Sequence, residues 1–149
     1  MRGLGICYFL LFSFTGLFSQ SNHWETLIKA PEQWRYFLGT VSPAAVEPAS
    51  NWRTLAFDDS GWLQGSGGFG YADGDDVTTI PPVMSVFMRK KFTIVDKTKI
   101  EAGIISVDYD DGFVAYLNGT EIARANMDGK GAYPPYTSTA SGFGDEGLI

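Results

Sequence analysis

The chain has 149 residues, a length that allows one domain and no more. Its 17 acidic residues outnumber its 11 basic residues, the formal net charge is −6, and no basic run occurs, which argues against nucleic acid and anionic membranes as partners. Eighteen glycines, seven prolines and 15% aromatic residues favour short strands joined by turns and packed around large rings, an all-β composition.

Residues 1–20 have the layout of a secretory signal peptide. Arg2 provides a positive start, and Leu4–Phe18 carries no charge. A membrane-spanning helix needs about 20 apolar residues, and this run is shorter. We therefore expect residues 21–149 to be a secreted module, extracellular or at the cell surface, with no membrane association after cleavage; an uncleaved membrane anchor is the alternative. The only cysteine, Cys7, lies in the signal segment, so the mature module would hold its fold without disulfides.

After the signal segment the apolar pattern is that of strands rather than helices. Trp34–Leu38 is a predicted aromatic strand, and Val86–Ile94 alternates apolar and polar residues with a break at Lys90. Ile104–Ala125 predicts a three-stranded meander with turns at Asp110–Gly112 and at Asn118–Gly119. Asn-Gly between two strand-like runs is the strongest short-range hairpin signal, because both residues tolerate the positive φ of a type I′ turn. Two long loops are also predicted, over residues 39–51 and 65–82.

No catalytic constellation can be assembled from these residue types. His23 is the sole histidine, so neither a histidine-dependent nucleophile nor a zinc site of several His and Cys ligands is expected. The Gly-rich run 65–70 matches G-x-G-x-x-G, but the prolines that follow prevent the helix that a nucleotide site requires. Carboxylates are plentiful enough for glycoside hydrolysis, although any acidic domain would offer them. We predict that the segment has no catalytic residue.

Two Asp-rich runs are candidates for a structural Ca²⁺ site, since calcium takes six to eight oxygen ligands from loops. The candidate ligands are Asp73, Asp75, Asp76, Asp110 and Asp111. Turn formation is the alternative interpretation: Asp side chains bond to their own backbone, and the glycine that follows supplies a positive φ.

Aromatic side chains in the loops could stack on sugar rings and so bind a glycan or polysaccharide. The candidates are Phe69, Tyr71, Tyr133 and Tyr136. The alternative is that such rings fill the core, which is the interpretation that we favour for Trp34, Trp52 and Trp62.

The order of short signatures resembles a known family. Trp34-Arg35-Tyr36, Phe57-Asp58-Asp59-Ser60-Gly61-Trp62, Arg89-Lys90-x-Phe92 and the run Asp110–Gly119 (DDGFVAYLNG) follow one another. Together they are similar to the galactose-binding-domain-like jelly-roll module of secreted bacterial multidomain proteins, and to the sugar-binding domain that precedes the catalytic barrel of some β-glycosidases. The resemblance covers about residues 27–125.

The resemblance implies a jelly-roll β-sandwich whose final strands follow Ile149, so that residues 21–149 would be an incomplete module joined to downstream domains. It also implies a non-catalytic accessory role in an exported protein, either carbohydrate-binding or structural and adhesive. The alternative is the non-catalytic N-terminal domain of a secreted enzyme, such as a glycoside hydrolase or a phosphoesterase.

Overall fold

The computed structural model describes residues 23–44, 48–71, 74, 76–127 and 129–142. Within these residues the fold is built from strands, with two short 3₁₀ turns and no α-helix, so the predicted all-β class is confirmed. The strands are β1 (Gln33–Leu38), β2 (Leu63–Ser66), β3 (Phe69–Gly70), β4 (Thr78–Thr79), β5 (Val86–Arg89), β6 (Phe113–Leu117) and β7 (Thr120–Ala125). The 3₁₀ turns are η1 (Ala49–Arg53) and η2 (Lys97–Lys99). No helix in the described part of the chain has the length and apolar character needed to cross a bilayer.

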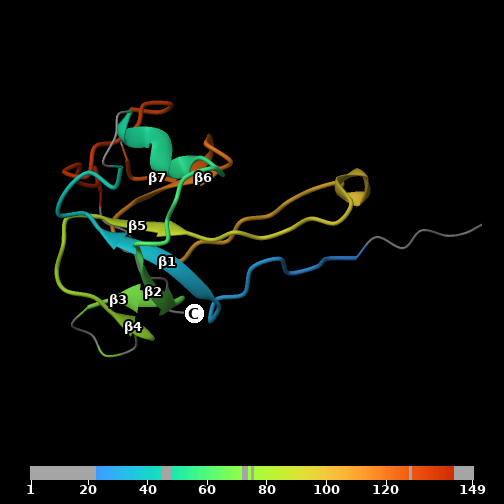
Figure 1. The fold of residues 1–149 in the computed structure, drawn as a ribbon, viewed down its shortest axis with the longest axis horizontal. Helices are drawn as coiled ribbons and strands as arrows, with labels where there is room; N and C mark the ends of the chain where they lie inside the picture. The colour runs from blue at the N-terminus through green and yellow to red at the C-terminus, as the bar shows by residue number, and fades with distance from the viewer. Residues whose placement is uncertain (1–22, 45–47, 72–73, 75, 128, 143–149) are drawn as a thin grey trace, which may run out of the picture.

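A three-stranded antiparallel sheet of order β2-β1-β5 forms the centre of the molecule (Figure 1). The aromatic run predicted as a strand is β1, which pairs with β2 from Gln33 opposite Ser66 and with β5 up to Leu38 opposite Val86. β1 ends at Leu38 and is followed by Gly39, where a side chain would collide with Ser85. The absence of a side chain at Gly39 therefore allows the chain entering β5 to approach the end of β1 closely.

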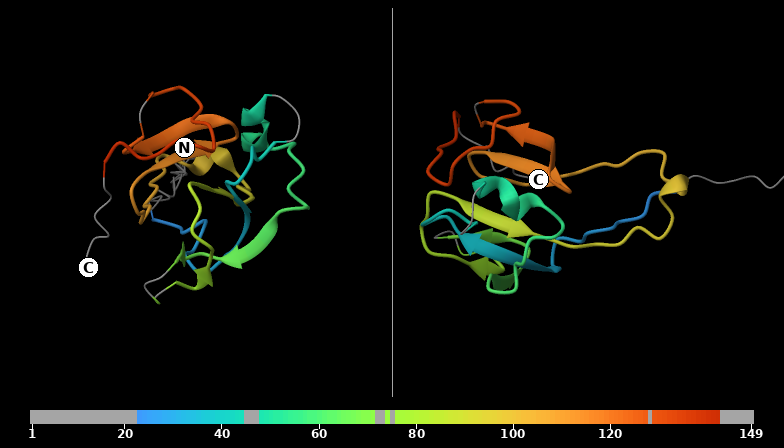
Figure 2. Two further views of the ribbon diagram at one scale, coloured as in Figure 1. Left: turned by 90° about the vertical axis from the view of Figure 1, so that its left-hand side faces the viewer. Right: turned by 45° about the horizontal axis from the view of Figure 1, so that its top comes forward.

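The hairpin β6-β7 confirms the turn predicted at Asn-Gly. Asn118 has a φ of 49° and Gly119 a φ of 87°, the two positive values that a type I′ turn requires. The register shifts between Ala115 and Tyr116, an irregularity that bends the ribbon. In two views the hairpin lies as a second layer over the three-stranded sheet (Figures 1 and 2).

The loop predicted at 65–82 contains local structure that alternation did not indicate. β3 and β4 form a two-residue parallel pair, with Phe69 opposite Thr78. Thr78 Oγ1 donates a hydrogen bond of 2.7 Å to Ser66 O, and Gly65 leaves room for both the Thr78 and Phe69 side chains. These contacts fold the glycine-rich segment back beneath β2.

An aromatic cluster fills the space between the two layers. Trp52, Trp62 and Phe87 are buried, and Phe37, Phe57, Tyr116, Tyr133 and Tyr136 pack around them. Trp52 lies at the centre, with ring centroids 5.1 Å from Phe87 and 6.0 Å from Tyr116, both edge-to-face. The predicted core role is confirmed for Trp52 and Trp62, whereas Trp34 is half-buried.

Two of the predicted strands are shorter or absent in the structure. The strand predicted over Val86–Ile94 ends at Arg89, and the first strand of the meander, residues 104–109, does not form. Both segments leave the body and run out to η2, forming a projection that we call the arm, residues 90–109 (Figures 1 and 2). Every residue from Lys91 to Asp108 is exposed. Alternation was present in both segments, but neither has a neighbouring strand in the described chain.

Candidate functional site

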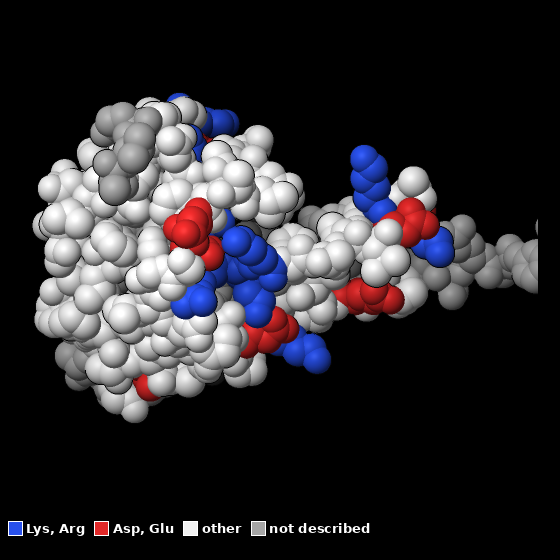
Figure 3. All heavy atoms as spheres, in the orientation of Figure 1, with Lys and Arg blue, Asp and Glu red and all other residues white. Residues whose placement is uncertain are grey.

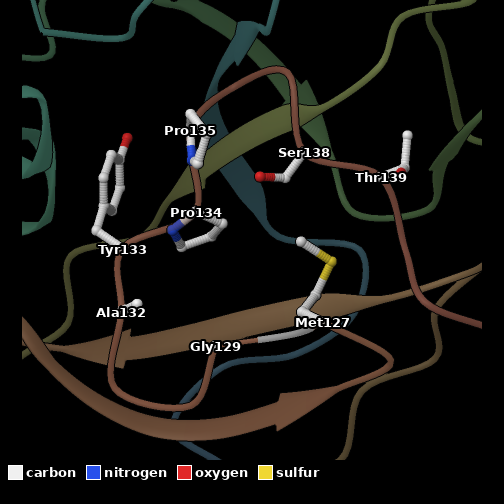
Figure 4. A pocket seen from close by; sticks show the side chains of 8 residues that line it. All are labelled: Met127, Gly129, Ala132, Tyr133, Pro134, Pro135, Ser138 and Thr139. Atoms are coloured by element: carbon white, nitrogen blue, oxygen red, sulfur yellow. The ribbon is translucent and has the colours of Figure 1, made fainter.

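A shallow hollow lies next to the β6-β7 hairpin (Figure 4). Its volume is about 250 Å³. Its lining consists of Met127, Gly129, Ala132, Tyr133, Pro134, Pro135, Ser138 and Thr139. The lining therefore combines one aromatic ring, two proline rings and a thioether with two hydroxyl groups, an apolar surface with a few polar groups at its edge.

Tight turns give the hollow its shape. Gly129 and Gly131 have φ values of 70° and 79°, which a side chain would strain, and the Ala132 N–H donates to Gly129 O at 2.7 Å. On the other side of the hollow, the Ser138 N–H donates to Pro135 O at 2.9 Å. The prolines between these turns have fixed φ angles, so the lining is held with little conformational freedom.

Tyr133 is the lining residue most firmly held by the core. Trp52 Nε1 donates a hydrogen bond of 2.9 Å to the Tyr133 hydroxyl, and the Arg53 guanidinium lies 5.2 Å from the centre of the Tyr133 ring. Arg53 also lies 4.5 Å from the Tyr116 ring centre, so η1 is joined to both the loop and β6. A ring fixed in this way loses little entropy when a ligand packs against it.

A hydrogen bond from Arg124 ties the same loop to β7. Arg124 Nε and Nη2 each donate to the Glu121 carboxylate at 2.9 Å, and Nη2 also donates to Ala132 O at 2.8 Å. These hydrogen bonds from Arg124 hold the pKa of Glu121 below its ordinary value. The bidentate pair fixes the Arg124 side chain, and the Arg124 hydrogen bond to Ala132 O anchors the first turn of the hollow to the hairpin.

The four predicted sugar-binding aromatics occupy two separate places. Tyr133 lines the hollow, and Tyr136 lies beside it but packs against the aromatic core, its carbonyl accepting a 2.7 Å hydrogen bond from Ser85 Oγ. Phe69 and Tyr71 lie at β3, on the other side of the three-stranded sheet. Phe69 is half-buried against Tyr36, at a ring distance of 5.1 Å, whereas Tyr71 is exposed.

The predicted calcium ligands are also divided. Asp76 packs against the backbone of Gly70 in the β3-β4 loop, whereas Asp110 and Asp111 form the turn before β6. Asp73 and Asp75 lie outside the described residues. Among the residues that the structure describes, no three His, Cys, Asp or Glu side chains converge as a metal-binding group.

Turn geometry accounts for Asp110 and Asp111, with one difference from expectation. The positive φ is at Asp111, 61°, rather than at the glycine that follows. Asp110 O accepts from the Gly112 N–H at 2.9 Å, and Asp111 O accepts from Asn126 Nδ2 at 2.7 Å. Gly112 is needed because a β-carbon there would lie about 3 Å from the carbonyl oxygens of Ala125 and Asn126.

A calcium site in the loop that contains Asp76 stays a prediction, and its test is thermal unfolding. If a cation is bound there, EDTA lowers the melting temperature and added Ca²⁺ restores it, because a ligand that binds only the folded state stabilises it. Mg²⁺ added at the same concentration is the control, since its smaller octahedral shell suits this loop less well. Melting curves that coincide with and without EDTA would remove the metal from consideration.

A buried ion pair that was not predicted explains two of the sequence signatures. Arg89 Nε donates to Asp59 Oδ2 at 2.7 Å, and Arg89 Nη1 donates to the carbonyls of Trp52 and Thr54. Burial alone would raise the pKa of Asp59, but the hydrogen bond and charge of Arg89, aided by Lys91, outweigh it and hold the pKa below its ordinary value. The signatures around Asp59 and Arg89 are thus two halves of one structural contact.

The neighbouring acid has a different structural role. Asp58 Oδ1 accepts a 2.9 Å hydrogen bond from the Ser60 N–H, which closes an Asx turn and lowers the pKa of Asp58. That turn leads directly to the buried Trp62. An acid followed by Ser-Gly-Trp could have predicted the turn, but nothing in the sequence indicated that Arg89, 30 residues after Asp59, would pair with it.

Comparisons with known proteins do not place the chain. No family model matches it, and no curated protein or solved structure matches it at the significance required.

Proposed function

We propose that the protein is a non-catalytic accessory module of an exported protein and that it binds carbohydrate at the hollow between Met127 and Thr139. The observation that carries the proposal is the composition of this hollow, which is lined by the Tyr133 ring that the core holds, by two prolines and by two residues that bear hydroxyl groups, Ser138 and Thr139. Sugar rings present apolar C–H faces and a rim of hydroxyls, and a surface of this composition complements both.

The form of the hollow favours a chain of sugars over a small metabolite. It is open and smaller than the enclosed pockets that bury most of a drug-sized ligand. An open surface of this kind admits part of a longer polymer without enclosing its ends. The signal-peptide pattern in residues 1–20 supports the same interpretation, because exported modules meet polysaccharides outside the cell.

The proposed architecture is the jelly-roll sandwich implied by the family resemblance. Two layers with an aromatic core between them support this proposal, as does the type I′ hairpin within the DDGFVAYLNG run. In such proteins the module acts together with downstream domains, which would determine whether the whole protein is an adhesin or an enzyme. We propose the accessory role for either case.

The test compares the polysaccharide binding of a variant that lacks the hollow's two hydroxyl groups with that of a variant that lacks a neighbouring hydroxyl group outside the hollow. Ser138→Ala combined with Thr139→Ala is expected to weaken binding about tenfold, since each lost hydrogen bond is worth about 0.5–1.5 kcal/mol. Thr137→Ala, one residue outside the lining, is the matched control and should bind normally. Affinity electrophoresis in gels containing galactan, mannan or β-glucan provides the measurement. Unretarded migration of the wild-type chain in all three, and on a glycan array, would reject carbohydrate binding and leave a structural role.

A further inference from the structure

Residues 90–96 of the arm extend a strand that has an unpaired edge. β5 is the last strand of the order β2-β1-β5, and residues 91–95 make no backbone hydrogen bond with any other described residue. The Val95 side chain is 99% exposed, and Phe92 and Ile94 are exposed as well. The segment contains no turn from Lys90 to Ile94, and the chain bends at Val95 before Asp96 caps η2. An edge with apolar side chains and free N–H and C=O groups is a template for another strand.

The sequence of this segment is complementary to its own reverse. When two copies run antiparallel with Thr93 opposite Thr93, Lys90 faces Asp96 and Phe92 faces Ile94. Opposite charges, an aromatic ring against a β-branched chain, and paired threonines are each favourable as cross-strand neighbours. On the second face Lys91 lies opposite Val95, where its methylene chain can cover the exposed valine.

We infer that residues 90–96 straighten at Val95 and form a dimerisation strand, through which a second copy of this chain pairs antiparallel about a two-fold axis at Thr93. The three-stranded sheets of the two copies become one continuous sheet. The contact is isologous, so each favourable pair except the central Thr93 pair occurs twice, and the pairing closes after two chains. Charge complementarity between Lys90 and Asp96 favours this register. Shifting the register by one residue would also place apolar side chains that now face each other on opposite faces of the sheet.

The contacts already made by the two charged residues leave room for the partner. Lys90 Nζ lies 2.5 Å from Glu32 Oε2 and donates to Gln33 O at 3.1 Å, which uses two of its three protons. Asp96 accepts from Thr98 through Oδ1 only, whereas its Oδ2 lies 3.9 Å from Lys99 Nζ, beyond hydrogen-bond distance. Charged side chains gather where the arm joins the body and near its tip (Figure 3), so both ends of the paired segment are marked by charge.

Charge exchange between two variants tests the inference. Sedimentation velocity of the purified chain should show a monomer–dimer equilibrium. Lys90→Glu alone places carboxylates opposite Asp96, and Asp96→Lys alone places ammonium groups opposite Lys90, so each is expected to weaken dimerisation about tenfold or more. A mixture of the two variants should form heterodimers with wild-type affinity, because each altered residue then meets its opposite charge.

Two further variants separate pairing from local damage. The double variant Lys90→Glu/Asp96→Lys loses the Glu32 contact and the Thr98 cap but keeps the cross-strand charge pairs, so it should dimerise as wild type does. Lys97→Glu makes the same charge change outside the paired segment and should leave the equilibrium unchanged. A monomeric wild-type chain at every concentration would overturn the inference, as would a mixture of the single variants that stays monomeric.

Discussion

Replacing Asp59 with alanine is expected to lower the free energy of unfolding by about 3 kcal/mol, because it leaves the Arg89 guanidinium buried without its counter-charge. The Arg89 and Asp59 side chains are only 8% and 12% exposed. Arg89 also donates to carbonyls of the η1 segment, so losing its anchor loosens the contact between β5 and the residues around Trp52. Urea unfolding followed by tryptophan fluorescence measures the change.

Lys91→Ala is the matched control for this prediction. Lys91 Nζ lies 3.5 Å from the second oxygen of Asp59, but its side chain is 55% exposed, so its removal should cost less than about 1 kcal/mol. Acid should reproduce the Asp59 loss: the folded pKa of Asp59 is lowered, so its contribution is present above the unfolded value of about 3.9 and is lost as the pH falls through the folded value. Equal losses for the two alanine variants would contradict the buried pair.

Trp52→Ala is expected to be as damaging, with a loss of about 3–5 kcal/mol. The indole is buried, contacts three other aromatic rings and donates to the Tyr133 hydroxyl, so its removal leaves a cavity and takes away that hydrogen bond. Because folded domains are stable by only about 5–15 kcal/mol, the variant is expected to melt at a clearly lower temperature than the wild-type chain. Calorimetry measures the shift.

Trp24→Ala provides the comparison for the core tryptophan. The Trp24 side chain is 71% exposed, so its loss should change the unfolding free energy by less than about 0.5 kcal/mol. A conservative Trp52→Phe variant should retain most of the packing but lose the hydrogen bond to Tyr133. If Trp24→Ala destabilised the protein as much as Trp52→Ala, the aromatic cluster could not be the core of the fold.

Local signals predicted the elements that the chain forms through short-range chemistry. The hairpin at Asn118 was readable because two adjacent residues tolerate a positive φ, and β1 was readable as an aromatic run that ends at a glycine. Tryptophans at positions 52 and 62 were expected in the core and are buried there. Each of these features depends on a few neighbouring residues.

Features that depend on distant partners could not be predicted in the same way. Apolar and polar residues alternate over residues 104–109 as they do in a strand. This pattern indicates which side chains share a face, but it does not indicate whether a neighbouring strand is present to pair with. The β3-β4 pair was hidden in a glycine-rich loop, since two residues are too few to show a period. The ion pair of Asp59 with Arg89 joins residues 30 positions apart, and the sequence does not indicate which acidic residue pairs with which basic residue.

The candidate site was predicted in part for the same reason. Tyr133 is a predicted candidate because it is an aromatic residue in a loop, and it lines the hollow while also packing against the core. Tyr136 and Phe69 are candidates on the same grounds but do not line the hollow, because a loop sequence does not show which rings share a surface. The hydroxyls of Ser138 and Thr139 had no motif and were placed by the turn at Pro135.

Carbohydrate binding at the hollow is tested most directly by titrating the ¹⁵N-labelled chain with the oligosaccharide that corresponds to whichever polysaccharide retards it. The account predicts that the amide resonances that shift belong to Gly129, Ala132, Ser138 and Thr139, with those of β3 unchanged. Shifts confined to Phe69 and Tyr71, or a spectrum that stays the same at saturating sugar, would contradict it.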